Sequence, residues 1–458
     1  MGFNGYGRGV RASKNIAYLI QMVANCDSIL VPLWHSGVDV SQTITGLVEK
    51  TDPARSRSRL SQASSLSSSP VILPSSSLPL DEAAASLLTS ENSELPQMPS
   101  LDTLISILTS SRSVIVEGGS ACAYDPSTFT DTLPLNSLLA VIQNVMLWRL
   151  QMKAPSIFIC IGHQLACEAL TRLVIQVVDD VREEYRRIES DENDEVPEWL
   201  RELKRIVERI DETGKEIQIF SRGSPPIRGY RHPQFTVTKN CVAEMGTKRL
   251  RMFTPLNRET HPLPQKLFKA HTVTAHRYCE YNLLSMLTKK FGVGLDIVMF
   301  HTDRVSYEAV LFDNWALSKL HTFLIQYKND VALSTFSWLL NMPSGIEISA
   351  STTLPHDDGT GEAVHTLVAA TTIFYEDFDT TTVRSSFTLQ FHPELFDSLH
   401  IVSDVCKFLY FIFQIKIKIY LFFIVEDGSI FKPTYEELRQ EHGVQLLCRM
   451  LHTNSHLS

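Results

Sequence analysis

Cys160 is the residue of this 458-residue chain whose surroundings best suit covalent chemistry. It lies within Ile157–Ile161, an uncharged apolar run typical of a strand buried on both faces of a parallel sheet. Gly162 follows, and then an apolar pattern of helical spacing. A nucleophile at such a strand-to-helix junction is pushed out above the sheet, where the positive end of the helix favours a thiolate. Taken alone, Cys160 fits a buried structural cysteine better.

A histidine and a glutamate far downstream supply the partners that a cysteine nucleophile needs. His392 and Glu394 stand in the motif Q-F-H-P-E, at the end of a strand-like stretch. A histidine can take the proton of the thiol, and a carboxylate can hold the imidazole ring in the correct orientation. Together with Cys160, these residues predict acyl transfer through a covalent thioester.

The motifs C-x-G-H-Q and, later, Q-F-H-P-E resemble those of the class I glutamine amidotransferases, in the same order along the chain. In that family the cysteine attacks the side-chain amide of glutamine, and the histidine–glutamate pair serves it. The resemblance therefore implies a catalytic triad of Cys160, His392 and Glu394, with glutamate and ammonia as products. No cofactor is implied.

The resemblance also implies the groups that surround the triad. In the family, a Gly-Gly turn after a strand and the residue after the nucleophile hold the oxyanion, while the Gln of G-H-Q and an H-x-D region line the glutamine pocket. These expectations fall on Gly118, Gly119, Ile161, Gln164, His301 and Asp303. The Gly-Gly turn equally suits a tight turn without function. His163 is interpreted as structural.

The alternation of apolar strands and helices predicts an α/β fold. The resemblance narrows this to a flavodoxin-like, mostly parallel sheet with helices on both faces and helical insertions. We assign residues 1–407 to this domain, including a Ser-rich loop at 52–78 and a charged helical insertion at 179–216. Opposite charges three and four residues apart predict two surface helices in that insertion, joined by an acidic turn. A solvated hairpin is favoured there over a partner-docking arm.

Two features leave a catalytically silent relative open, acting as a binding or scaffold protein. Phe158 stands two residues before the nucleophile, where family members usually carry Gly, and the insertion is unusual. An active protein would be a glutaminase-type amidotransferase or a γ-glutamyl hydrolase. No G-x-x-x-x-G-K-[ST] phosphate loop occurs, so a synthase that accepts the ammonia would be a separate chain.

Composition indicates a globular protein of the cytoplasm. The chain is 44% hydrophobic and has a net charge of −9, which gives no indication of nucleic-acid binding. Its eight cysteines lack C-x-x-C spacing, so they are interpreted as reduced thiols. Neither H-E-x-x-H nor paired Cys/His spacing occurs, so no metal site is expected.

Residues 408–425 form an apolar stretch that precedes a C-terminal tail, 426–458. Lys416 and Lys418 stand at its middle, where each would cost about 2.5–3.5 kcal/mol in a bilayer. Its composition suggests translated non-coding sequence, such as a retained intron. A buried strand and a membrane anchor are the alternatives, and we expect no membrane association.

Overall fold

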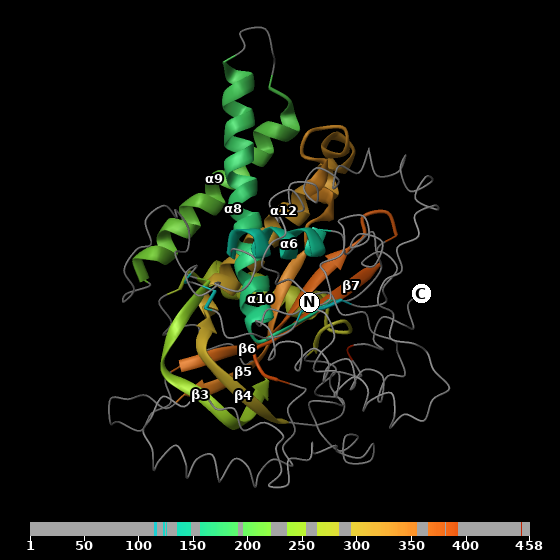
Figure 1. Cartoon of the computed structure of the whole chain (residues 1–458). Coiled ribbons are helices and arrows are strands. Elements are labelled where there is room, and N and C mark those ends of the chain that lie inside the picture. Colours follow the sequence, from blue (N-terminus) through green and yellow to red (C-terminus); the bar gives the residue numbers. More distant parts are fainter. Residues whose placement is uncertain are drawn as a thin grey trace, which may run out of the picture.

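The structure is a computed structural model, and it describes the central part of the chain (Figure 1). The described residues are 114–116, 122, 123, 125, 135–147, 156–190, 196–220, 236–252, 263–283, 295–354, 365–380, 382–392 and 450. Several predicted features lie outside these ranges. They are the loop 52–78, the turn Gly118–Gly119, Glu394, the stretch 408–425 and the tail 426–458 apart from residue 450.

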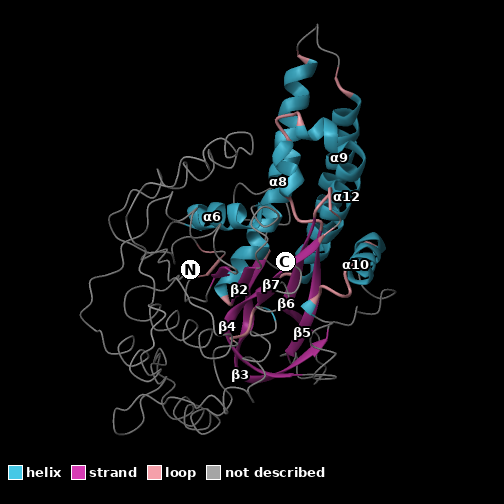
Figure 2. Ribbon diagram, turned by 90° about the vertical axis from the view of Figure 1, so that its right-hand side faces the viewer, coloured by secondary structure: helices cyan, strands magenta, loops and turns pink. Residues whose placement is uncertain are grey.

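A seven-stranded sheet organises the described part of the chain, in the order β1-β2-β7-β6-β5-β3-β4. The strands are β1 (Val114–Val116), β2 (Ser156–Ile159), β3 (Val237–Met252), β4 (Leu295–Val305), β5 (Gly345–Leu354), β6 (His365–Glu376) and β7 (Val383–Leu389). The predicted α/β class is confirmed, because helices pack against this sheet (Figure 2).

The expectation of a mostly parallel sheet is wrong for the described strands. Only β1–β2 and β2–β7 pair in parallel, while the other neighbouring pairs are antiparallel. The connection between β6 and β7 shows the reason, because Asp377 N donates to Thr382 O at 3.0 Å and closes a short hairpin. A hairpin that short can join only antiparallel strands, since a parallel pair needs a long crossover. The sheet is therefore mixed.

The described helices are α6 (Leu135–Leu147), α8 (Ile161–Glu189), α9 (Glu198–Phe220), α10 (Gln265–Arg277) and α12 (Tyr307–Ala332), followed by the 3-10 helix η2 (Ser337–Asn341). Their buried side chains form one hydrophobic cluster with alternate residues of the strands, among them Val116, Phe158, Ile346 and Ile373. Since alternate residues of a strand point to opposite faces, all these helices lie against one face of the sheet. The prediction of helices on both faces is therefore wrong for the described helices.

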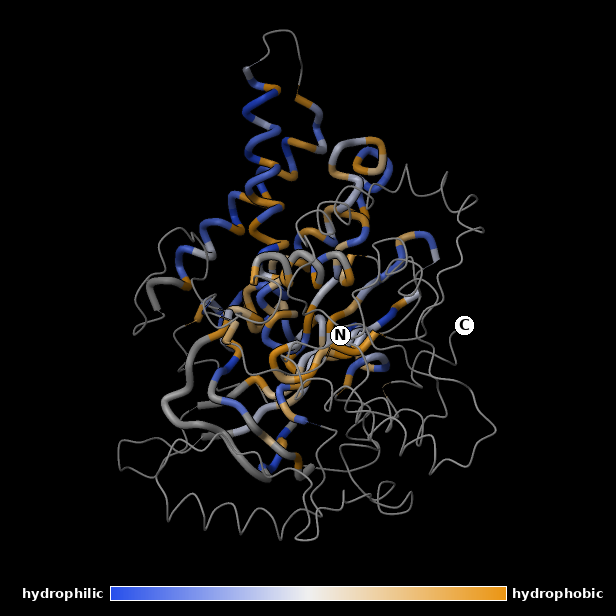
Figure 3. Tube along the Cα trace, viewed as in Figure 1, coloured by the Kyte–Doolittle hydropathy of each residue, from blue (hydrophilic) through white to orange (hydrophobic). Residues whose placement is uncertain are grey.

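The charged insertion is helical, but it is not a separate hairpin. Its first helix is the outer end of α8, which continues without a break from Ile161 to Glu189. The second helix is α9, which packs against both α8 and α12 through residues such as Leu203 and Val207. Hydrophilic residues gather where α8 extends beyond the sheet (Figure 3). Among the helices of the described ranges, none combines the length and apolar character that a membrane crossing requires.

Helix side chains also accept hydrogen bonds from two backbone N–H groups of β5. Ile346 N donates to Asn314 Oδ1 at 3.1 Å, and Ile348 N donates to His271 Nε2 at 3.0 Å. An uncovered row of backbone N–H groups would invite pairing with another chain. The bulge at β5 and these two side chains replace the missing strand partner at this position.

The opposite face of the sheet carries a second hydrophobic cluster that includes Ile157, Leu389 and Phe391. Glu347 belongs to this face, because Ile346 and Ile348 on either side of it point into the helix-side cluster. Its side chain is buried, and no described group donates to Oε2. Burial raises the pKa of Glu347 to about 7, against a smaller opposing effect of the hydrogen bond from Asn282.

Replacing Glu347 by Gln is expected to stabilise the protein at pH 8 by up to about 3 kcal/mol, and to have little effect below pH 4.5. The folded protein holds the proton of Glu347 to higher pH than the unfolded chain does. The stabilisation that this proton provides is therefore fully present below the pKa of Glu347 in the unfolded chain, and it is lost as the pH rises towards 7. Urea denaturation of both proteins at several pH values measures the difference.

The exposed Glu280 provides the matched control, since Glu280→Gln removes a surface carboxylate two residues before Asn282. Parallel stability–pH curves for the wild type and Glu347→Gln would contradict the prediction.

Candidate active site at the end of strand β2

The strand-to-helix junction predicted at Cys160 is confirmed, and its backbone is strained. Cys160 is the N-cap of α8 and has φ 53° and ψ −110°. No other non-glycine residue of the described ranges has a positive φ. Such a conformation costs about 1–3 kcal/mol and persists only where the surrounding structure enforces it. The bend is held by Cys160 N, which donates to Leu389 O at 2.7 Å.

The topology gathers the predicted site segments at one edge of the sheet. β2 lies between β1 and β7 and is parallel to both, so the carboxyl ends of all three strands meet at that edge. Cys160 follows β2, and the half-buried His392 follows shortly after β7. The stretch that leads to Gly118 follows β1. The structure therefore brings Cys160 and the segment of His392 to adjacent strand ends, while Glu394, Gly118 and Gly119 lie outside the described residues.

Ile161 is the first residue of α8, directly after the bend. The first backbone N–H groups of a helix have no acceptor within that helix, so they are available to an anion. The Cys160 side chain does not cap them. The backbone N–H of Ile161, which is an expected oxyanion donor, is one of these groups.

Gln390 contacts the sulfur of Cys160, and Gln164 contacts Gln390. Gln390 Nε2 donates to Cys160 Sγ at 4.0 Å, and Gln390 Oε1 accepts a hydrogen bond from Gln164 Nε2 at 3.2 Å. Both side chains are buried, with 1% and 2% of Gln390 and Gln164 exposed. No described group donates to Gln164 Oε1, so this oxygen is a buried acceptor on a side chain that contacts Gln390. Sequence reasoning selected Gln164 but missed Gln390, although it stands within the Q-F-H-P-E motif.

His163 is unsuited to act as the base, although it lies close to Cys160 in the sequence. Burial, helped by the neighbouring His301, lowers the pKa of His163 to about 3, against a smaller opposing effect of the Val368 backbone. A general base works best when its pKa lies near the working pH. His163 Nδ1 instead pairs with Thr388 Oγ1 at 2.5 Å, which fastens the start of α8 to β7. This agrees with the structural interpretation of His163.

His301 and Asp303 lie in β4, at the far end of the strand order. β4 nevertheless packs against α8. His301 also interacts electrostatically with His163, so His301 lies near the start of that helix. His301 is buried, and its Nδ1–H donates to Asp303 O at 2.6 Å. The H-T-D stretch is thus close to the helix that Cys160 begins.

Cys167 shows what distinguishes the junction cysteine from an ordinary buried thiol. It lies on α8 within the hydrophobic cluster, where burial and the nearby Asp313 raise the pKa of its thiol. Burial also raises the pKa of Asp313 well above its usual value, and Asp313 Oδ2 accepts a hydrogen bond from Thr171 at 2.6 Å. A thiol in such surroundings stays protonated and inert.

Phe158 is accommodated without loss of the bend. It is fully buried in the helix-side cluster and pairs with Val116 on one side and Thr388 on the other. The side chain thus points away from the opposite face, to which Ile157 and Ile159 contribute. The strained backbone of Cys160 therefore coexists with a large residue at this position.

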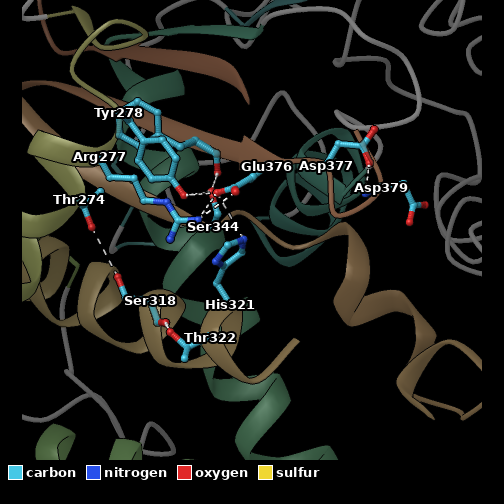
Figure 4. Close-up of polar contacts among 11 residues, drawn as sticks. Thr274, Arg277, Tyr278, Ser318, His321, Thr322, Ser344, Glu376, Asp377 and Asp379 are labelled. Carbon is cyan, nitrogen blue, oxygen red and sulfur yellow. Dashed lines mark hydrogen bonds and ion pairs between the residues drawn. The ribbon is translucent and has the colours of Figure 1, made fainter. Parts of the chain in front are cut away.

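A second polar cluster lies at the other end of the sheet, around Glu376 (Figure 4). Arg277 Nη2 donates to both oxygens of Glu376, at 2.9 and 2.7 Å, and Tyr278 Oη donates to Oε2 at 2.9 Å. His321 stacks on Phe378, and burial lowers the pKa of His321 to about 4. These contacts join the end of α10 to the β6–β7 hairpin, and β6 runs antiparallel to β7. The cluster is therefore remote from Cys160.

No model of a known protein family matches the chain, and no curated protein matches it either. Within the described ranges, no three His, Cys, Asp or Glu side chains gather closely enough to hold a metal ion. The function is therefore argued from the geometry at the end of β2.

If the backbone of Cys160 is strained, replacing it by glycine is expected to destabilise the protein less than replacing it by alanine. Cys160→Gly is expected to be more stable than Cys160→Ala by about 1 kcal/mol, because glycine adopts a positive φ without steric cost. In the helix interior the order is reversed, and Ala169→Gly is expected to cost about 1 kcal/mol. Denaturant unfolding of the three variants measures both differences. If Cys160→Gly were less stable than Cys160→Ala, the junction would not be strained.

Proposed function

We propose that the protein is a class I glutamine amidotransferase-like enzyme, which hydrolyses a carboxamide through a thioester on Cys160 and releases glutamate and ammonia. The observation that carries this proposal is the strained Cys160 at the start of α8, next to the strand end that leads to His392. A structural cysteine has no need of such a conformation, which usually reflects function.

The proposed reaction begins with proton transfer from the Cys160 thiol to His392. The thiolate attacks the carboxamide carbon, and the oxyanion is held by backbone N–H groups of Ile161 and of Gly118 or Gly119. One such donor typically contributes about 3–4 kcal/mol to lowering the barrier. The leaving amide nitrogen takes the proton from His392 and departs as ammonia. Water, deprotonated by His392, then cleaves the thioester to glutamate, and Glu394 orients the imidazole throughout.

The substrate in this proposal is glutamine or another γ-glutamyl compound. Gln164 supports this choice, because its unpartnered Oε1 is a buried acceptor that an N–H group of the substrate can satisfy. His301 and Asp303 complete the pocket in the proposal. The cytoplasmic location belongs to the same proposal, and a separate synthase is the expected acceptor of the ammonia. A γ-glutamyl hydrolase would use the same chemistry without that partner.

Ammonia release from glutamine is expected to fall at least about a thousandfold in Cys160→Ser and in His392→Asn, since members of a catalytic unit fail together. The matched control is Cys279→Ser, which replaces an exposed cysteine and is expected to keep the wild-type rate. Coupled detection of ammonia and glutamate measures the rates, with glutamine and with γ-glutamyl amides as substrates.

Release without a partner supports a hydrolase, and release only with a synthase supports an amidotransferase subunit. If the wild type releases no ammonia under any of these conditions, and a glutamine-like electrophile leaves Cys160 unmodified, the protein is a binding or scaffold module.

A further inference from the structure

We infer that Gln390 is a functional residue of the Cys160 site, whose amide N–H holds the sulfur as a thiolate while Gln164 fixes the direction of that amide. The inference rests on the proposed function in one respect, namely that Cys160 reacts as a thiolate. No residue of the Q-F-H-P-E motif other than His392 and Glu394 has so far received a role.

The position of Gln390 is set by the sheet. Its backbone N–H donates to Ala369 O at 2.8 Å, directly beyond Leu389, whose carbonyl accepts the hydrogen bond from Cys160 N. Cys160 and Gln390 are thus fastened to each other through two adjacent strand ends. The backbone hydrogen bonds that hold the bend at Cys160 therefore also place the side chain of Gln390 near the sulfur.

The direction of the Gln390 amide is set by Gln164. Gln390 Oε1 accepts the hydrogen bond from Gln164 Nε2, so its NH2 group is the end that faces Cys160 Sγ at 4.0 Å. Gln164 is itself placed by α8, where its backbone N–H donates to Cys160 O at 3.2 Å. The pair therefore presents a donor to the sulfur from a fixed direction.

A donor in this place favours the anion over the neutral thiol. Hydrogen bonds to an ionised acceptor are roughly twice as strong as those to a neutral acceptor, and a buried site increases the difference. With only 5% of Cys160 exposed, water can contribute little to stabilising the charge. Gln390 and the first N–H groups of α8 then take the place of water.

The test uses alkylation of Cys160 by iodoacetamide, a small carboxamide, which requires neither glutamine nor a partner. Mass spectrometry of the Cys160 peptide separates its modification from that of the other cysteines. In Gln390→Leu, which keeps the volume but removes the donor, the rate is expected to fall about tenfold at pH 7. The deficit is expected to shrink as the pH is raised, because a higher pH favours the thiolate in both proteins.

Two further variants separate this role from a structural one. Gln164→Leu releases the Gln390 amide from its anchor, so a smaller decrease with the same pH dependence is expected. Gln143→Leu is the matched control, because Gln143 Nε2 donates to Ala169 O of α8 at 3.2 Å without contacting the sulfur. The control is expected to alkylate at the wild-type rate. Should Gln390→Leu fail to fold, Gln164→Leu alone carries the test.

The outcomes distinguish this inference from the proposed function. If the wild type releases no ammonia but its alkylation depends on Gln390, the role of Gln390 is supported and the glutaminase activity is ruled out. Ammonia release with equal alkylation of the wild type and Gln390→Leu at pH 7 overturns the inference and keeps the enzyme. A decrease that is equal at all pH values indicates distorted packing and also overturns it, as does a wild-type Cys160 that iodoacetamide never modifies.

Discussion

The site depends on one backbone conformation, the positive φ of Cys160 between β2 and α8. A strained residue persists only if its neighbours are fixed more strongly than the strain can move them. On one side, β2 is an interior strand, buried on both faces and paired with β1 and β7. On the other, α8 buries its inner half against the sheet from Ile161 to Val181. The chain has no freedom to relax the bend without disturbing one of these elements.

Polar contacts fix the orientation of α8 within this packing. One face of α8 carries His163, Cys167 and Thr171, four residues apart, so they lie in line along the helix. His163 pairs with Thr388, Thr388 with Thr371 at 2.6 Å, and Thr171 with Asp313. Hydrophobic packing alone would tolerate a small rotation of α8, whereas these hydrogen bonds fix its angle. The angle determines where the first N–H groups of the helix point.

The sequence predicts local features well and the sheet poorly, for a physical reason. Strand β2 and the helix after Cys160 follow from short patterns of apolar residues, and the structure confirms them. Strand direction depends instead on the lengths of the connections, and the turn at Asp377–Thr382 makes β6 and β7 antiparallel. Gln390 was missed because its role depends on the register of β7 against β2, which no local pattern specifies.

Burial decides which of the polar groups near the junction can carry charge. It lowers the pKa of His163 and raises the pKa values of Cys167 and Asp313, so each of these groups is held in its neutral form. In the proposed reaction, an anion on the Cys160 sulfur is stabilised by the start of α8 and by the Gln390 amide, and His392 receives the proton. On this proposal, charge is kept out of the buried interior and develops only at the ends of the strands.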